Sequence, residues 1–385
     1  MDGVWVRKWA DRKNKIVKSR CCSRGFLYRQ KDTIDRHSST ASRLSHRMAV
    51  SLGVQHGLVI ESLDISTAFL QGLKFSEVVT KAAELGHEVK QARKVWFKPP
   101  ANVWRHLRES PQSGIFVQDE DIEYFILELL KALYGLVDGP LLWQLALANF
   151  MVKELHFRTA LHDENFFYIT DGWKILAIYI THVDDILTMA SQDFLDWAHD
   201  VIYKKFGKVK RCVLPLIYVG VRHQLLAPGH ILLDQGHYIE KLKPAQVSSS
   251  THLKDDTRPL DAFEHKQFRS LLCSLLWVCL TRMDLCHGVV ALQSEMIKPT
   301  ILHLKQVNQL LKRALSTKHF NGLHFRRLRF PLRLVSVNDA SHASKRSGYP
   351  YEGKIVLMMS ESDVDFGTSG EWYRTADSRS FTGYG

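Results

Sequence analysis

Two adjacent aspartates stand between two apolar runs in the stretch IYITHVDDILTMA, residues 178–190. The flanking residues favour β-strands, so Asp184 and Asp185 are predicted at the tip of a hairpin. Two like charges at one turn repel each other, and the repulsion raises the pKa of one carboxyl unless a cation balances them. Mg²⁺ prefers hard oxygen ligands, which makes the pair a candidate metal site. A solvated pair of surface acids is the plain alternative.

A third aspartate, Asp64, lies at the end of another apolar run. The stretch LVIESLDISTAFLQG, residues 58–72, predicts a strand that leads into a turn or a helix, with Asp64 at the change. The runs beside Asp184 and Asp185 are apolar on both faces, which is typical of central strands. Three carboxylates at the ends of neighbouring strands would form a two-metal site, in which the ions clamp the attacking and leaving oxygens of a phosphoryl transfer.

The elements that position these aspartates follow from periodicity and from turn residues. Asp171-Gly172 predicts one tight hairpin, and Val183-Asp184 predicts a second. The segment 123–136 is apolar with a helical or strand-like start, and 245–258 has the composition of a linker. Helices are predicted over 40–56, 74–95, 141–155, 192–206, 262–281 and 299–315. Strands are predicted within 164–170, 173–183, 216–226, 229–244 and 332–341, and a helix follows the strand within 229–244.

Length and charge narrow the class of protein. A chain of 385 residues exceeds one typical core, which predicts two or three subdomains, and its 45% hydrophobic content is that of a folded protein. The formal net charge of +12 suits a polyanionic partner such as nucleic acid. Residues 1–30 are strongly basic, and a strand pair whose cations face phosphates is predicted there. A basic protein with no such partner, or a solvated terminal segment, would have the same composition.

The cysteines and the apolar runs bear on the cellular compartment. No CxxC pair and no secretory signal occur, which predicts a reduced intracellular location, cytoplasmic with the nucleus as a further possibility, and not secretion. The spacing of Cys273, Cys279 and Cys286 fits no common zinc ligand set. The longest uncharged stretch, 139–152, is too short to span a bilayer, so no membrane role is predicted.

Six stretches occur in the order of motifs known from one enzyme family. SLDISTAFLQG resembles D-V-x-T-A-F-L-N-G, ELLKALYGLVDGPLLW resembles K-x-x-K-A-L-Y-G-L-K-Q-A-P-x-x-W, and IYITHVDDIL is similar to a Y-V-D-D hairpin. The family is the reverse transcriptase of copia-type LTR retrotransposons. The other three stretches that resemble it are KSRCCSRGF at 18–26, FRSLLCSLLWVCLTRMDL at 268–285 and VSVNDASHAS at 335–344.

The resemblance implies an α+β fold in the shape of a right hand, with an antiparallel palm sheet backed by helices. Part of the fingers would take residues 1–60, the palm with a finger insertion 61–207, and the thumb and connection 208–330. Residues 331–385 would be the truncated start of a ribonuclease H domain and an unstructured tail.

The resemblance also implies roles for individual residues. Asp64, Asp184 and Asp185 would be the catalytic residues and would hold two Mg²⁺ ions, with Mn²⁺ as the alternative ion. Trp143 would shape the template and nucleotide pocket, although a core tryptophan explains it almost as well. The implied nucleotide-binding residues are Lys18, Arg20, Arg24, Phe69, Gly135 and Pro140.

Departures from the family pattern concern the polymerase site and the ribonuclease H segment. His182 stands where the family has Tyr, and Val137-Asp138 replaces Lys-Gln, which would put an acid beside the incoming nucleotide. By the same resemblance Asp339 would be a ribonuclease H aspartate, but no recognisable set of partner carboxylates follows it, and a solvated acidic tail explains Glu361, Asp363 and Asp365 better. The segment is therefore expected to be inactive, and the chain to be a fragment of a polyprotein or a genomic remnant.

Three functions remain open at this point. The first is an RNA-directed DNA polymerase that binds an RNA/DNA template–primer and deoxynucleoside triphosphates. The second is a catalytically inactive remnant that at most binds nucleic acid. The third is a metal-dependent nuclease that uses the same carboxylates. The sequence makes no prediction of oligomeric state.

Overall fold

The computed structural model describes residues 1–28, 31–89, 92–111, 113–114, 119–319, 321–341, 351–363, 365–366 and 372–373. The chain divides into two compact units, Met1–His324 and Phe325–Gly385, and each is described by itself. The fold is mixed α/β with antiparallel sheets. No helix of the described residues is long and apolar enough to cross a bilayer.

A six-stranded sheet forms the centre of the first unit, in the order β10-β3-β9-β8-β7-β6. Both predicted hairpins are present, because β7 turns into β8 at Gly172 and β8 turns into β9 at Asp184. The predicted central position of β8 and β9 is confirmed. The strands are β3 (Val59–Ile65), β6 (Arg158–Ala160), β7 (Asp163–Asp171), β8 (Lys174–His182), β9 (Asp185–Ala190) and β10 (Val209–Val213).

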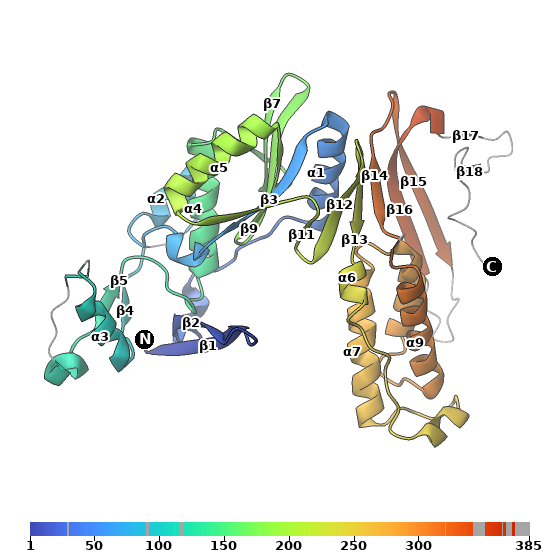
Figure 1. Cartoon of the computed structure of the whole chain (residues 1–385), viewed down its shortest axis with the longest axis horizontal. Coiled ribbons are helices and arrows are strands. Elements are labelled where there is room, and N and C mark those ends of the chain that lie inside the picture. The colour runs from blue at the N-terminus through green and yellow to red at the C-terminus, as the bar shows by residue number, and fades with distance from the viewer. Residues whose placement is uncertain are drawn as a thin grey trace. The chain divides into compact units, whose positions relative to one another are not determined.

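Helices cover both faces of this sheet. On one face, α4 (Gly139–Lys153) and α5 (Gln192–Phe206) pack through buried apolar side chains onto alternate residues of β3, β8 and β9. On the other face, α1 (Arg43–His56) contacts β8 and β9, and Gly53 lies against Met189. Figure 1 shows α4 and α5 on one side of the sheet and α1 on the other.

The three helices around the sheet begin and end close to their predicted limits. Ser42 and Ser191 accept backbone N–H groups at the starts of α1 and α5, which is the usual role of serine at an N-cap. Gly57 ends α1 in the left-handed region, with φ of 67°. The helix α5 has the predicted bounds, and α4 begins two residues earlier than predicted, with Pro140 in its first turn.

The N-terminal part of the unit is more irregular than predicted. The predicted strand pair is present as β1 (Gly3–Asp11) and β2 (Ile16–Ser23). The predicted helix over 74–95 is wrong in extent, because among the described residues of this stretch only Val78–Glu84 (α2) is an α-helix, and the chain turns at Gly86 with φ of 79°. Further short elements are α3 (Ala101–Glu109), β4 (Val95–Phe97) and β5 (Leu127–Leu129). The strand β5 is the main regular element within the apolar segment 123–136.

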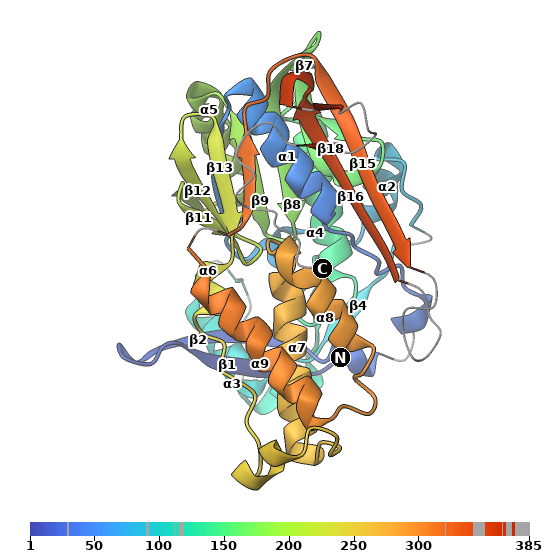
Figure 2. The same cartoon turned by 90° about the vertical axis from the view of Figure 1, so that its right-hand side faces the viewer.

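A second sheet and a group of helices complete the first unit, and the last strand of this sheet, β14, runs past the end of the unit at His324. The sheet has the order β11-β12-β13-β14, with the predicted turn around Gly229. Helices α7, α8 and α9 lie side by side in Figure 2 and pack around one apolar core, and α8 was not predicted. These elements are β11 (Leu216–Tyr218), β12 (Val221–Ala227), β13 (His230–Asp234), β14 (Leu323–Arg326), α6 (Gly236–Ile239), α7 (Ala262–Val278), α8 (Cys286–Gln293) and α9 (Ile301–Ser316).

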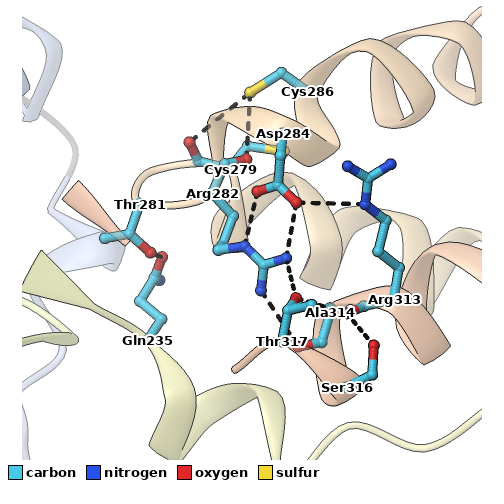
Figure 3. Close-up of polar contacts among 10 residues, drawn as sticks. All are labelled: Gln235, Cys279, Thr281, Arg282, Asp284, Cys286, Arg313, Ala314, Ser316 and Thr317. Carbon is cyan, nitrogen blue, oxygen red and sulfur yellow. Dashed lines mark hydrogen bonds and ion pairs between the residues drawn. The ribbon is translucent and has the colours of Figure 1, made fainter. Parts of the chain in front are cut away.

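A buried arginine joins the turn after α7 to the end of α9. Arg282 is 1% exposed and donates from Nε and Nη2 to the Asp284 carboxylate, at 2.8 Å for each bond. The same guanidinium donates to the Thr317 hydroxyl at 2.7 Å and to the Ala314 carbonyl at 3.3 Å (Figure 3). A buried cation requires such partners, so this network fixes how the helices meet.

The second unit contains a strand ribbon, β15 (Leu332–Ser341) paired with β16 (Tyr351–Ser360). Asp339 lies opposite Gly353 on the exposed part of the ribbon, and Glu361 pairs with Arg333. Residues 342–344 of the motif that resembles ribonuclease H, and the tail from 374, lie outside the described residues. The other strands of the unit are β17 (Asp365–Phe366) and β18 (Trp372–Tyr373).

Short 3-10 turns link several of these elements. They are Gly25–Leu27, Lys31–Thr33, Ala68–Gln71, Asp119–Tyr124, Ser250–Lys254, Met283–Leu285 and Glu361–Asp363.

Candidate active site

The register of the central sheet brings the three predicted aspartates together. Asp64, the residue before the last of β3, lies directly opposite Asp185, the first residue of β9. Directly opposed residues of an antiparallel pair point to the same face of the sheet. Asp184 precedes Asp185 in the turn between β8 and β9. We call Asp64, Asp184 and Asp185 the aspartate cluster; it lies at one end of the two strands.

The same register extends a row of ionisable side chains across four strands. Lys210 of β10 is opposite Asp64, and His182 of β8 is opposite Asp185. The row Lys210–Asp64–Asp185–His182 therefore lies on one face, the face that carries α1 further along the strands. No motif marked Lys210, because only the pairing of β10 with β3 places it beside the aspartates.

Burial and the neighbouring carboxylates disfavour the charged form of Asp185. Burial, together with the nearby charges of Asp184 and Asp64, raises the pKa of Asp185 to about 6, while Lys210 opposes this rise. Burial lowers the pKa of His182, and Asp184 acts in the opposite direction. The fold thus holds a carboxylate where its charge is unfavourable, which is a recurrent property of functional sites.

The turn that carries Asp184 is fixed from two sides. Val183 has φ of 60°, a left-handed conformation that a β-branched residue rarely adopts. The indole of Trp143, which is 1% exposed, donates to the Val183 carbonyl at 2.6 Å. The backbone N–H of Ile65 donates to the Asp184 carbonyl at 3.2 Å. Trp143 on α4 is therefore a core residue that braces the turn.

The donor set of the aspartate cluster fits a divalent cation. Three carboxylates supply the hard oxygen ligands that Mg²⁺ requires, and a cation would relieve the repulsion that raises the pKa of Asp185. In this conformation the three side chains do not bring one oxygen each to within 4.8 Å of one another. Binding would therefore require rotation of side chains, and the exposed Asp64 and Asp184 have room for it.

One other cluster of potential metal ligands occurs among the described residues. His252, Asp261 and Glu264 bring one ligand atom each to within 4.8 Å of one another. Asp261 and Glu264 form the capping box of α7, and Arg258 already pairs with the buried Glu264. Existing contacts thus satisfy these carboxylates, and the cluster is a helix cap.

The predicted nucleotide-binding residues lie on or just after β2, after β3, and just before or in the first turn of α4. Lys18 and Arg24 are exposed, and the Arg20 guanidinium lies 4.8 Å from the centroid of the Tyr134 ring. Phe69 is partly buried and meets the same ring edge-on, with 6.1 Å between centroids. Tyr134 thus links β2 to the segment after β3.

Gly135 permits a close approach of two backbones. It has φ of 89°, and a Cβ at this position would lie 2.2 Å from the Ser23 carbonyl oxygen at the end of β2. The Ser23 N–H donates to the Tyr134 carbonyl at 2.7 Å. Gly135 therefore holds β2 against the segment that leads into α4, which places Arg24 beside that segment.

Comparison with known proteins identifies the relatives of the chain. No protein-family model matches it. It is 24% identical over 379 residues to the retrovirus-related Pol polyprotein from transposon RE1 of Arabidopsis thaliana, across 94% of this chain and 23% of that protein. It is 23% identical over 363 residues to the corresponding polyprotein from transposon RE2 of the same plant, across 91% and 22%. To the polyprotein from transposon TNT 1-94 of Nicotiana tabacum it is 23% identical over 336 residues, across 80% and 22%.

The chain is a retrotransposon-derived relative of copia-type Pol polyproteins. It spans about a fifth of the length of these relatives. The predicted resemblance to copia-type retrotransposons is thereby confirmed.

Asp138, one of the departures from the family pattern, has a partner in the structure that the sequence did not predict. The sequence predicts an acid beside the incoming nucleotide at Asp138, and in the structure this residue is 4% exposed. Both carboxylate oxygens accept hydrogen bonds from Arg93, at 2.8 and 2.6 Å. The Asp138 carboxylate is therefore paired with an arginine inside the protein. Arg93 lies just before β4, and no motif marked it.

Proposed function

We propose that the chain is an RNA-directed DNA polymerase core, which transfers deoxynucleotides to the 3′-hydroxyl of a primer. The observation that carries the proposal is the register of β3 and β9, which sets Asp64 opposite Asp185 with Asp184 in the adjoining turn. The relation to copia-type Pol polyproteins supports it, because the aspartates lie within the matched part of the chain. The implied fold is that of a right-hand polymerase.

The aspartate cluster would hold two Mg²⁺ ions, or Mn²⁺ in their place. Such ions lower the barrier by activating the attacking hydroxyl and by balancing the charge that develops on the transferred phosphate. Asp64 and Asp185 would orient the site from two rigid strands, while Asp184 would act from the braced turn. Sites built on such elements hold their geometry well.

The partners would be an RNA/DNA template–primer and deoxynucleoside triphosphates. Lys18, Arg20 and Arg24 would contact phosphates, and Phe69, Gly135 and Pro140 would border the nucleotide. A net charge of +12 supports contacts made mainly to the nucleic-acid backbone. The ribonuclease H segment around Asp339 is proposed to be inactive.

Primer extension on an RNA template with Mg²⁺ tests this function. We expect the wild-type chain to extend the primer, and Asp184→Asn to abolish extension because it removes a carboxylate from the aspartate cluster. Asp171→Asn is the matched control, since Asp171 is an exposed acid in the neighbouring β7–β8 hairpin. Its variant should extend the primer at the wild-type rate.

The same assay separates the other functions. Binding of template–primer without extension, even with Mn²⁺, would assign an inactive remnant that retains nucleic-acid binding. Metal-dependent shortening of the template, lost in Asp184→Asn, would assign a nuclease. Extension that persists in Asp184→Asn would remove the aspartate cluster from the mechanism.

A further inference from the structure

The Arg93–Asp138 ion pair is buried and geometrically specific. The side chains are 12% and 6% exposed, and two parallel hydrogen bonds of 2.8 and 2.6 Å join them. The Arg93 guanidinium also lies 5.4 Å from the ring centroid of Tyr28 and 5.2 Å from that of Phe75. One arginine thus gathers segments that are far apart in the chain, with a planar geometry that lysine does not offer.

The ion pair takes the place of the helix-capping role that Asp138 could have at the start of α4. Asp138 is the N-cap residue of α4, where a carboxylate commonly accepts the first N–H groups of a helix. It makes no side-chain capping bond, because its oxygens are engaged by Arg93 and its backbone, with φ of −96° and ψ of −3°, is helical. The carboxylate is therefore directed to Arg93 and away from the start of α4.

The start of α4 adjoins the aspartate cluster. Trp143, in the second turn of the helix, donates to the carbonyl of Val183, the residue before Asp184. Pro140 and Val183 line the same small cavity. An uncompensated charge at Asp138 would act on any ligand held between this helix and the cluster, because the screening length at physiological salt is about 8 Å.

We propose that Arg93 is a positioning residue for the incoming nucleoside triphosphate: it holds the Asp138 carboxylate inside the protein and cancels its charge. The aspartate cluster already supplies three carboxylates, and a fourth unpaired one would repel the polyanionic triphosphate. With Arg93 in place, the segment from Gly135 to Pro140 presents no net charge to the nucleotide. The inference depends on the proposed polymerase function and adds a residue that the sequence motifs do not contain.

Two single substitutions, one that removes the positive charge and one that removes the negative charge, distinguish this electrostatic role from a purely structural one. In steady-state primer extension, Arg93→Met should raise the KM for the deoxynucleotide about tenfold, the effect of one unit charge about 10 Å away. The kcat should remain within about twofold, and the rise in KM should shrink as salt is added. Asp138→Asn should leave KM unchanged or lower it, because it removes the negative charge.

The double variant Arg93→Met/Asp138→Asn carries the decisive comparison. It leaves no buried charge, and it should restore KM to within about twofold of the wild-type value. Arg93→Lys keeps the cation and should resemble the wild type in KM more closely than Arg93→Met does. Arg105→Met is the matched control, because Arg105 pairs with Glu109 on the exposed surface of α3. Melting temperatures of all variants report folding.

The outcomes separate the inference from the function on which it depends. A wild-type chain that does not extend primers defeats the proposed function, and this inference with it. An active wild type whose Arg93→Met and Asp138→Asn variants both raise KM, or whose double variant fails to restore it, overturns the inference alone. If Arg93→Met does not fold, the KM values of Asp138→Asn and of the double variant decide in the same way.

Discussion

At the scale of single residues, Asp185 carries a charge that the fold disfavours. Burial, Asp184 and Asp64 together raise the pKa of Asp185 to about 6, against an ordinary value of 3.8. A carboxyl whose pKa is higher in the folded state binds its proton more tightly there. Its contribution to stability is therefore fully present below about pH 4 and is lost as the pH rises through about 6. A divalent cation would reverse that loss.

Thermal unfolding in EDTA should show that the charge of Asp185 lowers the stability of the protein. We expect Asp185→Asn to melt at a higher temperature than the wild type at pH 7.5, because it removes a disfavoured charge, and at a similar temperature near pH 4. Mg²⁺ should raise the melting temperature of the wild type and not that of the variant. A variant that melts lower than the wild type at pH 7.5 in EDTA would contradict the assignment of this charge as unfavourable.

At the scale of elements, the β8–β9 hairpin depends on α4. The turn residue Val183 is in a strained conformation, and Trp143 of α4 donates to its carbonyl at 2.6 Å. The Trp143 ring also packs edge-on against Phe206 of α5, with 5.3 Å between centroids. The helix therefore does more than fill the core, because its indole fixes the backbone from which Asp184 projects.

Trp143→Phe tests this contact between the elements. It keeps most of the apolar volume and removes the hydrogen bond, which contributes about 1 kcal/mol. We expect kcat for primer extension to fall about fivefold, the equivalent of about 1 kcal/mol, because the bond acts on the reacting geometry. Trp197→Phe on the exposed part of α5 is the control. Equal kcat values in the two variants, with a lowered melting temperature for Trp143→Phe alone, would leave Trp143 a stabilising role only.

The sequence predicted elements well where the pattern is local. The predicted helix over 192–206 matches α5, and the hairpins at Gly172 and Asp184 are where the turn residues place them. The predicted helix over 74–95 is too long, because composition favoured a helix across Gly86. The short α8 was missed because its apolar residues contact α7 and α9, so that no amphipathic period marks it.

At the scale of the whole molecule, the net charge of +12 predicts salt-sensitive binding of nucleic acid. The cations proposed to contact phosphates, Lys18, Arg20 and Arg24, lie on or just after β2. Lys153, Lys204 and Lys205 belong to α4 and α5, on the opposite face of the sheet from Asp64 and Asp185. The set on or just after β2 and the set on α4 and α5 carry the same positive charge, but they lie on different parts of the protein.

Substitution of each set by glutamine separates local binding from net charge. Replacing Lys18, Arg20 and Arg24 should reduce the slope of log K against log salt by about 0.9 for each phosphate of duplex DNA that the protein no longer neutralises. Replacing Lys153, Lys204 and Lys205 should change the affinity less and leave the slope nearly unchanged. Titrations with a labelled primer–template at several salt concentrations measure both. Equal slopes in the two variants would show that β2 has no special part in binding.

The sequence by itself determined the aspartates, the apolar strands beside them and the motif order that resembles copia-type reverse transcriptases, because these features depend on residue type and short spacing. The tertiary structure decided which side chains meet. Pairing of β3 with both β9 and β10 sets Asp64 between Asp185 and Lys210, and the loop before β4 delivers Arg93 to Asp138. Such contacts join residues far apart in the chain, and strand register and packing, which no local pattern encodes, bring them within reach.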